Sequence, residues 1–247
     1  MNGPSDAAVR AFRERLQAVR ERIADAARRA GRSPADVGLI GVTKTHPPEV
    51  AATAVAAGLV DLGENRVQEL LAKQPHVAGA RWHLIGPLQR NKVRHVVGRS
   101  ILLHTLDRPE LADALSRRAA GLGVVQRALV QVNVGADPAK AGCDLTETAS
   151  LVAYARDLPN LAVEGLMTMP PMPPEGVDHN TAARPVFAAL REERDRLRAR
   201  FPEVVHLSMG MSADLDAAVA EGATMVRVGT ALFGPRGEHS WRPEGER

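Results

Sequence analysis

A chain of 247 residues forms one large domain or two small ones, and 45% hydrophobic with 25% charged residues is ordinary for a globular protein. No apolar run approaches the ~20 residues of a membrane span, and the lone Cys143 excludes an internal disulfide framework, so we expect a cytoplasmic protein with no membrane partner. The net charge of +3 would suit nucleic acid, but only seven residues are aromatic and the arginine runs alternate with acids. We therefore expect no nucleic-acid partner.

The N-terminal residues 1–36 predict an amphipathic helix that packs on the body of the protein. Apolar side chains recur there every three or four positions, at Val9, Phe12, Leu16, Val19, Ile23 and Ala27. This spacing is that of one helix face. Acidic residues between the arginines argue against a transit peptide.

Eight short β-rich segments follow, each separated from the next by a helical pattern. They cover residues 37–44, 59–64, 81–86, 101–106, 127–134, 161–168, 204–209 and 224–230. Strands that alternate with helices pair in parallel, and eight such units match the size of a (β/α)8 barrel. The sequence therefore predicts the α/β class, with a single-domain (β/α)8 TIM barrel over 37–236 and a C-terminal tail over 237–247. An open doubly wound sheet is the alternative, which the lack of GxGxxG after the first strand weakens.

The stretch LIGVTKTHPP (39–48) places a lysine where the first strand ends. Arginine outnumbers lysine 28 to four in this chain, so Lys44 suggests chemistry that a guanidinium cannot perform. An amine can lose its proton and attack a carbonyl, and an apolar barrel mouth would favour its neutral form. Alternation along the strand points Lys44 into that mouth, although a lysine that snorkels to the surface is the alternative. Lys140, after the fifth strand, is the rival amine.

Two glycine-containing turns at the other side of the predicted barrel form a candidate phosphate cradle. They are HLSMGMSADL (206–215) after the seventh strand and VRVGTALFG (226–234) after the eighth. Backbone N–H groups can approach a ligand closely in such turns, and these loops are the recurrent phosphate site of the fold. Ser208, Gly229 and Thr230 offer hydroxyls and amides there.

Arg227 interrupts the otherwise apolar eighth strand two residues before Gly229. A charge in a barrel strand is costly unless it meets a partner, either in a structural ion pair or on a ligand heteroatom. A reactive amine, a phosphate cradle and a buried arginine together describe a site for pyridoxal 5′-phosphate (PLP). In that site Lys44 forms the Schiff base and Arg227 faces the pyridine nitrogen.

Long sequence blocks carry a resemblance to a known family. They are GVTKTHP (41–47), GENRVQEL (63–70), RWHLIGPLQRNKV (81–93), LVQVNV (129–134), GLMTM (165–169) and LSMGMSADLDAAVAEGATMVRVGTALFG (207–234). With them the sequence resembles the pyridoxal phosphate homeostasis proteins, single-barrel relatives of the alanine racemase N-terminal domain. The resemblance covers nearly the whole chain.

The resemblance implies a set of cofactor-binding residues. They are Lys44, Asn65, Ser208, Arg227, Gly229 and Thr230. Within this set Lys44 carries PLP, Asn65 lies near the ring and Arg227 lies at the ring nitrogen. His83 and Asn133 sit in matching motifs and are further candidates for the pocket wall.

The implied function is to bind, store or deliver PLP and so contribute to intracellular PLP and amino-acid homeostasis, without catalytic turnover. Alanine racemases supply a second proton donor from a tyrosine of a further domain, which we expect this chain to lack, and Tyr154, its one tyrosine, is predicted on an outer helix. An arginine at the pyridine nitrogen also makes PLP a poorer electron sink. The alternatives are a weak amino-acid racemase with His83 as second base, and a cofactor-free Schiff-base aldolase. PLP-dependent apoenzymes are candidate recipients, and we expect a monomer or weak dimer.

The histidines of three predicted strands raise the question of a metal site, but no HxH or HExxH spacing occurs, so we expect no metal at His83, His104 and His206. The Pro-rich segment 167–176 follows the sixth strand, where we expect a stiff segment at the rim of the barrel.

Overall fold

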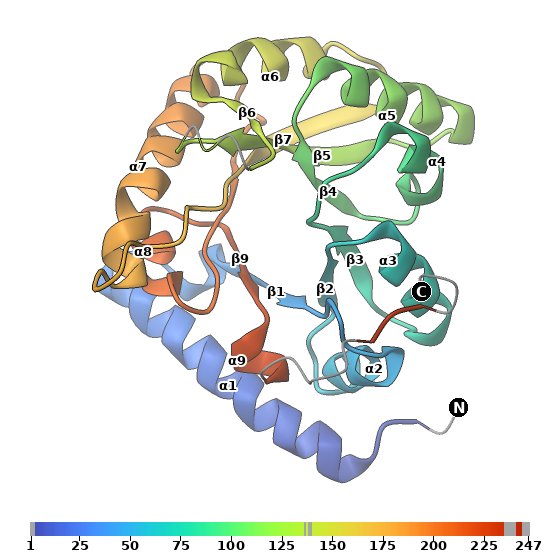
Figure 1. Ribbon diagram of the computed structural model, residues 1–247, viewed down its shortest axis with the longest axis vertical. Helices are drawn as coiled ribbons and strands as arrows, with labels where there is room; N and C mark the ends of the chain where they lie inside the picture. Colours follow the sequence, from blue (N-terminus) through green and yellow to red (C-terminus); the bar gives the residue numbers. More distant parts are fainter. Residues whose placement is uncertain (1–2, 136, 138–139, 235–240, 244–247) are drawn as a thin grey trace.

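Eight parallel strands close into a barrel in the computed structural model, which describes residues 3–135, 137, 140–234 and 241–243 (Figure 1). The strands are β1 (Gly38–Val42), β2 (Asp61–Glu64), β3 (Arg81–Leu84), β4 (Leu102–Leu106), β5 (Gln126–Asn133), β7 (Leu161–Met167), β8 (His206–Ser208) and β9 (Met225–Val228). Each pairs with its neighbours in this order, and β9 returns to pair with β1. The predicted (β/α)8 barrel is confirmed, with every strand bound within two residues of its predicted place. A further short strand, β6 (Cys143–Asp144), pairs with β5 and was not predicted.

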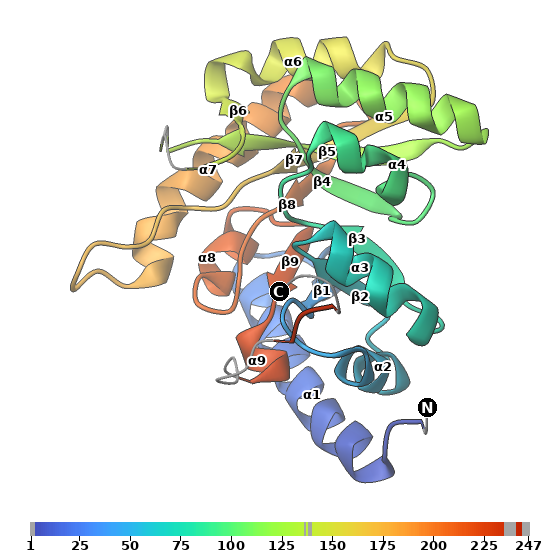
Figure 2. The same cartoon turned by 45° about the vertical axis from the view of Figure 1, so that its right-hand side comes forward.

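Helices surround the barrel, as both views show (Figures 1 and 2). They are α2 (Pro48–Ala56), α3 (Val67–Lys73), α4 (Val93–Val96), α5 (Pro109–Leu122), α6 (Thr148–Arg156), α7 (His179–Arg198), α8 (Leu215–Ala220) and α9 (Thr230–Phe233). The helices begin at residues that favour a helix start, since proline occupies the first turn of α2 and α5. At α7 the Asp178 carboxylate accepts the N–H groups of Asn180 and Thr181.

The N-terminal helix α1 (Asp6–Arg29) lies along the outside of the barrel against α2, α8 and α9 (Figure 1). Its predicted apolar face is buried from Phe12 to Ala27, with Val9 half-buried, and the Phe12 ring packs on Phe233 at 5.3 Å between centroids. The helix ends at Arg29, and the predicted boundary between an N-terminal segment 1–36 and the barrel stays a prediction. Of the predicted tail 237–247, residues 237–240 and 244–247 lie outside the described residues.

The barrel interior is only partly apolar. Leu102, Leu129 and Met167 form a small buried apolar cluster. Two residues beyond Leu102 on the same strand face, His104 is fully buried. None of the helices in the described part of the chain is long and apolar enough to cross a membrane.

Candidate functional site

A cavity of about 280 Å³ opens at the carboxyl ends of the strands. Its volume lies at the lower limit of small-molecule sites, ~300 Å³. The ends of β1, β2 and β9 and the loops after β7 and β8 supply the wall, made of Val42, Lys44, His46, Asn65, Ile85, Met169, Pro170, Pro171, Met172, His179, Met211, Ser212, Ala213, Asp214, Arg227, Gly229, Thr230 and Gly234. Five of the six predicted cofactor-binding residues therefore meet in one cavity. The sixth, Ser208, is fully buried and is not among the lining residues.

Lys44 follows β1 by two residues, and its half-buried side chain lines the cavity. The turn that carries it is unusual, because the next residue, Thr45, has a positive φ of 66°. A threonine in this region is strained and needs support from its surroundings. That support comes from two places: the Thr45 N–H donates to Glu69 Oε2 at 2.8 Å, and the Thr45 carbonyl accepts the Trp241 N–H at 3.0 Å.

A buried charged network, formed by Lys73, Glu64 and Glu69, lies directly behind this turn. The Lys73 ammonium donates to Glu64 Oε1 at 2.6 Å, to Glu69 Oε2 at 3.4 Å and to the Thr43 carbonyl at 2.8 Å. The Thr43 hydroxyl also donates to Glu64 Oε1, at 2.5 Å. Trp241 covers the network with its ring 4.9 Å from the ammonium. The residues on both sides of Lys44 are thus fixed by one network, which the sequence analysis did not identify.

The network makes stability depend on pH in a defined direction. Burial raises the pKa of Glu64 from 4.5 to about 7, although Lys73 and Thr43 act to lower it. Between pH 4.5 and about pH 7, Glu64 keeps its proton in the folded chain but has lost it in the unfolded chain. The contribution of Glu64 to the free energy of unfolding is therefore fully present below about pH 4.5, and it is lost as the pH rises through about 7.

We expect the free energy of unfolding of the wild type, measured in urea, to fall by a few kcal/mol between about pH 5 and about pH 8 because of the titration of Glu64. In Glu64→Gln, whose side chain does not titrate, this part of the decline should be absent. Parallel pH profiles for the two proteins would contradict the raised pKa of Glu64.

Arg227 stands on β9 with its guanidinium held from two sides. Its Nη1 donates to Ser208 Oγ at 2.6 Å and its Nη2 to the Thr168 carbonyl at 2.9 Å. Burial lowers the pKa of Arg227 to about 10, while the nearby Asp214 acts to raise it, and the group remains charged at neutral pH. A fixed cation therefore faces the cavity, and Ser208 lies behind it as a hydrogen-bond partner.

Asn65 follows β2 at the cavity wall beside a close backbone contact. A Cβ added to Gly86 would lie 2.0 Å from the Asn65 carbonyl oxygen. Glycine is therefore needed at residue 86 for the chain after β3 to pass this close to Asn65.

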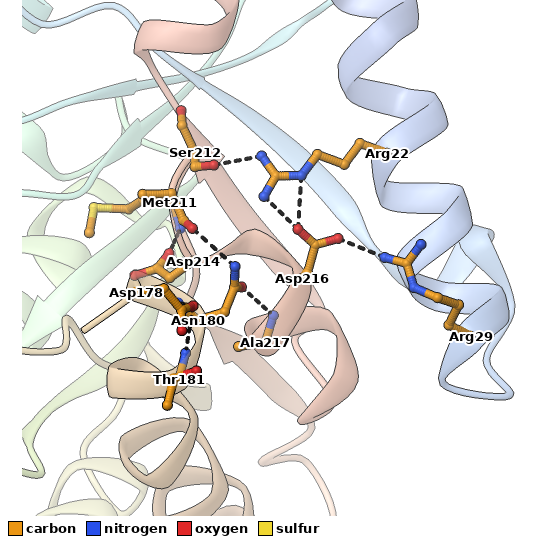
Figure 3. Close-up of polar contacts among 11 residues, drawn as sticks. Arg22, Arg29, Asp178, Asn180, Thr181, Met211, Ser212, Asp214, Asp216 and Ala217 are labelled. Carbon is orange, nitrogen blue, oxygen red and sulfur yellow. Dashed lines mark hydrogen bonds and ion pairs between the residues drawn. The ribbon is translucent and has the colours of Figure 1, made fainter. Parts of the chain in front are cut away.

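The loop after β8 contributes Ser212 to the cavity wall (Figure 3). This residue was not predicted as a site residue. Gly210 begins the loop with φ of 91°, and a Cβ there would lie 2.4 Å from Ala218 Cβ. The N-terminal helix then holds the loop from outside: Arg22 Nη1 donates to the Ser212 carbonyl at 2.7 Å, and its Nε and Nη2 donate to Asp216. The only signal available in the sequence was that Ser212 directly precedes the α8 turn in HLSMGMSADL.

The remaining predicted candidates lie outside the cavity wall. Asn133 bonds with the backbone of Asp137, and the Lys140 ammonium donates to the carbonyls of Met169 and Pro170 at 3.3 and 2.5 Å. Tyr154 is exposed on α6 and donates to Asp113.

The three strand histidines take other partners. His83 and His104 are buried and hydrogen-bond to each other, while His206 contacts Thr224. In the described part of the chain, no group of three or more His, Cys, Asp or Glu side chains is arranged to hold a metal ion.

Comparison with known proteins identifies the family. The family model for the N-terminal domain of alanine racemase matches residues 15–237. The pyridoxal phosphate homeostasis protein of Aquifex aeolicus is 45% identical over 226 residues, 90% of this chain and 97% of that protein. The protein of the same name from Escherichia coli K12 is 41% identical over 227 residues, 90% of this chain and 95% of that protein. The chain belongs to the pyridoxal phosphate homeostasis protein family.

Solved structures agree with this family and with the barrel. PipY of Synechococcus elongatus, determined with PLP bound, has a TM-score of 0.76 and 36% identity and covers 90% of this chain and 100% of its own. An alanine racemase from Corynebacterium glutamicum has a TM-score of 0.68 at 19% identity, with 92% of this chain and 65% of its own covered. At that identity it shows the barrel fold alone, whereas the homeostasis family matches both sequence and structure.

Proposed function

We propose that this protein binds PLP covalently through Lys44 and contributes to intracellular PLP homeostasis as a non-catalytic holder of the cofactor. The observation that carries the proposal is the single cavity that contains Lys44, Asn65, Arg227, Gly229 and Thr230. The names of its relatives, and the PLP in the PipY structure, support the same function. PLP would supply an aldehyde carbon to the cavity, and the neutral Lys44 amine is the group that would hold it covalently.

The chemistry of the cavity fits the groups of this cofactor. Gly229 and Thr230 form a tight turn whose backbone can approach a phosphate closely, and a Cβ on Gly229 would still lie 3.6 Å from the nearest atom, so the wall there is open. Ser212, from the loop after β8, lines the same cavity. We therefore assign the phosphate end to Ser212, Gly229 and Thr230, and we assign Ser208 to holding the Arg227 guanidinium.

Two observations support a non-catalytic role. PLP is a poorer electron sink when its ring nitrogen is unprotonated, and a guanidinium, which only donates hydrogen bonds, leaves that nitrogen unprotonated. In addition, the cavity wall contains no tyrosine among the described residues, and Tyr154 is exposed on an outer helix. A weak racemase would need a second base from the wall, where His46 and His179 lie, and not His83.

The protein should be tested by incubation with PLP, desalting and borohydride reduction, followed by mass mapping of the labelled peptide. We expect a yellow protein whose absorbance band disappears on reduction, with the label on the peptide that contains Lys44. A protein that stays colourless would overturn the proposal and favour the cofactor-free aldolase. Chiral analysis of alanine incubated with the loaded protein should show no turnover, and multiple turnovers would make it a racemase.

The contact between α1 and the Ser212 loop gives a further prediction. Replacing Arg22 by alanine should raise the Kd for PLP roughly threefold to tenfold, about 1 kcal/mol, because the Ser212 loop loses its outer support. Arg28→Ala is the matched control, since in the described part of the chain the Arg28 side chain pairs with the exposed Asp25 of its own helix and not with the Ser212 loop. Absorbance titration measures both variants, and equal affinity of Arg22→Ala and wild type would remove the Ser212 loop from the phosphate site.

Delivery of PLP to apoenzymes, a cytoplasmic location and a monomeric or weakly dimeric state are further parts of the proposal. Mixing the loaded protein with a PLP-dependent apoenzyme tests delivery, because transfer restores that enzyme's activity faster than the same amount of free PLP.

A further inference from the structure

A chain of hydrogen bonds runs through the barrel interior and ends on the buried arginine of the cavity. Asp61 Oδ1 lies 3.3 Å from His83 Nε2, and His83 Nδ1 lies 3.0 Å from His104 Nε2. His104 Nδ1 lies 2.8 Å from Ser208 Oγ, which accepts from Arg227 Nη1 at 2.6 Å. Five side chains from β2, β3, β4, β8 and β9 thus form one continuous path.

The two ends of this path lie at opposite ends of the barrel. Arg227 lines the cavity at the carboxyl ends of the strands. Asp61 is the first residue of β2 and lines a separate cavity of about 610 Å³, beside α1 and at the amino ends of β1 to β3. The Asp61 side chain is 24% exposed and also pairs with Arg81 at 2.5 Å. The path therefore joins a solvent-accessible carboxylate to a buried cation in the cofactor cavity.

The direction of the hydrogen bonds follows from the arginine end. A guanidinium only donates, so Ser208 Oγ accepts from Arg227 and keeps one proton to give. Among the described residues, the acceptor within reach of that proton is His104 Nδ1. His104 then carries its own hydrogen on Nε2 and donates it to His83 Nδ1.

The carboxylate end gives the same direction independently. Burial acts to raise the pKa of Asp61, but the hydrogen bonds from His83 and Arg81 outweigh it and lower the pKa, so Asp61 is ionised at neutral pH and only accepts. His83 must therefore carry its hydrogen on Nε2, which leaves Nδ1 to accept from His104. Burial also lowers the pKa of His104 well below its ordinary value, which keeps that ring neutral. Both ends require the Nε2–H tautomer in both histidines.

We propose that Asp61, His83, His104 and Ser208 form a positioning relay, which orients Arg227 in the cofactor cavity and couples it to the opposite end of the barrel. The ligand contact of Arg227 rests on the proposed function, whereas the relay itself does not. An acceptor at each position holds the next donor in one orientation, so without the Asp61 carboxylate the Arg227 end alone holds the tautomers. A fraction of the molecules is then expected to carry the His83 hydrogen on Nδ1, which forces His104 to accept at Nε2 and to donate from Nδ1 to Ser208.

The charged and titratable neighbours of the relay are few. Arg81 faces Asp61 from β3, His206 faces His104 from β8, and Asp214 faces Arg227 from the loop after β8. Among them, Arg81 is suited to a control because it is exposed and, within the described residues, contacts the relay through Asp61 alone.

The test is nitrogen NMR of the protein labelled with ¹⁵N in histidine and arginine, without PLP, at neutral pH. His83→Gln and His104→Gln assign the two rings. We expect Nε2–H on both rings in the wild type and in Arg81→Ala, and in Asp61→Ala a partial shift to Nδ1–H on both rings, with a shifted Arg227 side-chain signal. A wild-type His104 with its hydrogen on Nδ1 overturns the relay, and this result does not depend on the folding of Asp61→Ala.

A change at His83 that fails to reach His104 and Arg227 in Asp61→Ala overturns the coupling. PLP titration adds a functional readout: we expect Asp61→Ala to bind PLP roughly threefold to tenfold more weakly, with Arg81→Ala unchanged. Unchanged affinity in Asp61→Ala overturns the positioning role. If the wild type binds no PLP, the proposed function fails, while the tautomers still decide the relay.

Discussion

Replacing Lys44 by alanine is expected to abolish the PLP absorbance band and to reduce borohydride-trapped label to background. No other lysine lines the cavity in the part of the chain that the structure describes, so no second amine is in place to form the C=N bond. The methyl group of alanine fits the space that the lysine stem occupies, and Thr43 and Thr45 keep their bonds to the buried network. The fold and the phosphate end should therefore persist. Absorbance spectra, with mass measurement after reduction, check this result.

Lys140→Ala is the matched control, because Lys140 follows β5 at the same end of the barrel and was the rival amine in the sequence. Its ammonium donates to the Met169 and Pro170 carbonyls, and it is not among the lining residues. We expect this variant to bind PLP with the spectrum of the wild type. A Lys44→Ala protein as yellow as the wild type, together with a colourless Lys140→Ala, would move the cofactor to Lys140.

The barrel was predictable because its signals are local and repeated. Eight apolar segments with caps and glycine ends between them specify eight βα units, and each strand lies within two residues of its predicted bounds. Lys44 and Arg227 could also be predicted as site residues from the sequence. A lysine is exceptional at the end of an apolar strand, and an arginine is exceptional within one. Parallel strands bring their carboxyl ends to one side of the barrel, so these residues were expected to meet, and they line one cavity.

Which of the two serines lines the cavity could not be predicted from the sequence, because it depends on where β8 ends. Ser208 is the last residue of β8 and is buried in the barrel, whereas Ser212 lies four residues later on the cavity wall. A strand predicted to reach residue 209 leaves both serines at its end and gives no means to choose. The turn at Gly210, which redirects the chain between them, is a property of tertiary packing against Ala218.

The buried polar contacts were hidden for a related reason. His83 and His104 are 21 residues apart, and their contact depends on the stagger of β3 against β4. In sequence they are isolated histidines, which are most often satisfied singly. Lys73 was visible only as one of four lysines, and nothing local indicates that α3 turns its ammonium inward under the Lys44 turn. Interior polar networks are set by register and packing, which the strand pattern does not encode.

Lys73→Met is expected to be the most destabilising single substitution at the site. Lys73 is completely buried, and its removal leaves Glu64 and Glu69 facing each other without a cation in an apolar environment. Breaking a buried ion pair in this way costs about 3–5 kcal/mol, part of which Glu64 can avoid by taking up a proton. The loss should therefore be larger at about pH 8 than at about pH 5, since deprotonation of both carboxyls becomes unavoidable as pH rises. Urea denaturation at the two pH values measures it.

Lys92→Met is the matched control, because Lys92 lies in a surface turn (Arg90–Lys92) outside the network and the change in side chain is the same. Its effect should stay within ~0.5 kcal/mol, as for ordinary surface substitutions. The double variant Lys73→Met with Glu64→Gln removes one buried charge of each sign, and it should recover part of the stability that Lys73→Met loses. The double variant should bind PLP, since Glu69 still holds the Thr45 N–H. A Lys73→Met protein as stable as the Lys92 control would show that the network does not support the Lys44 turn.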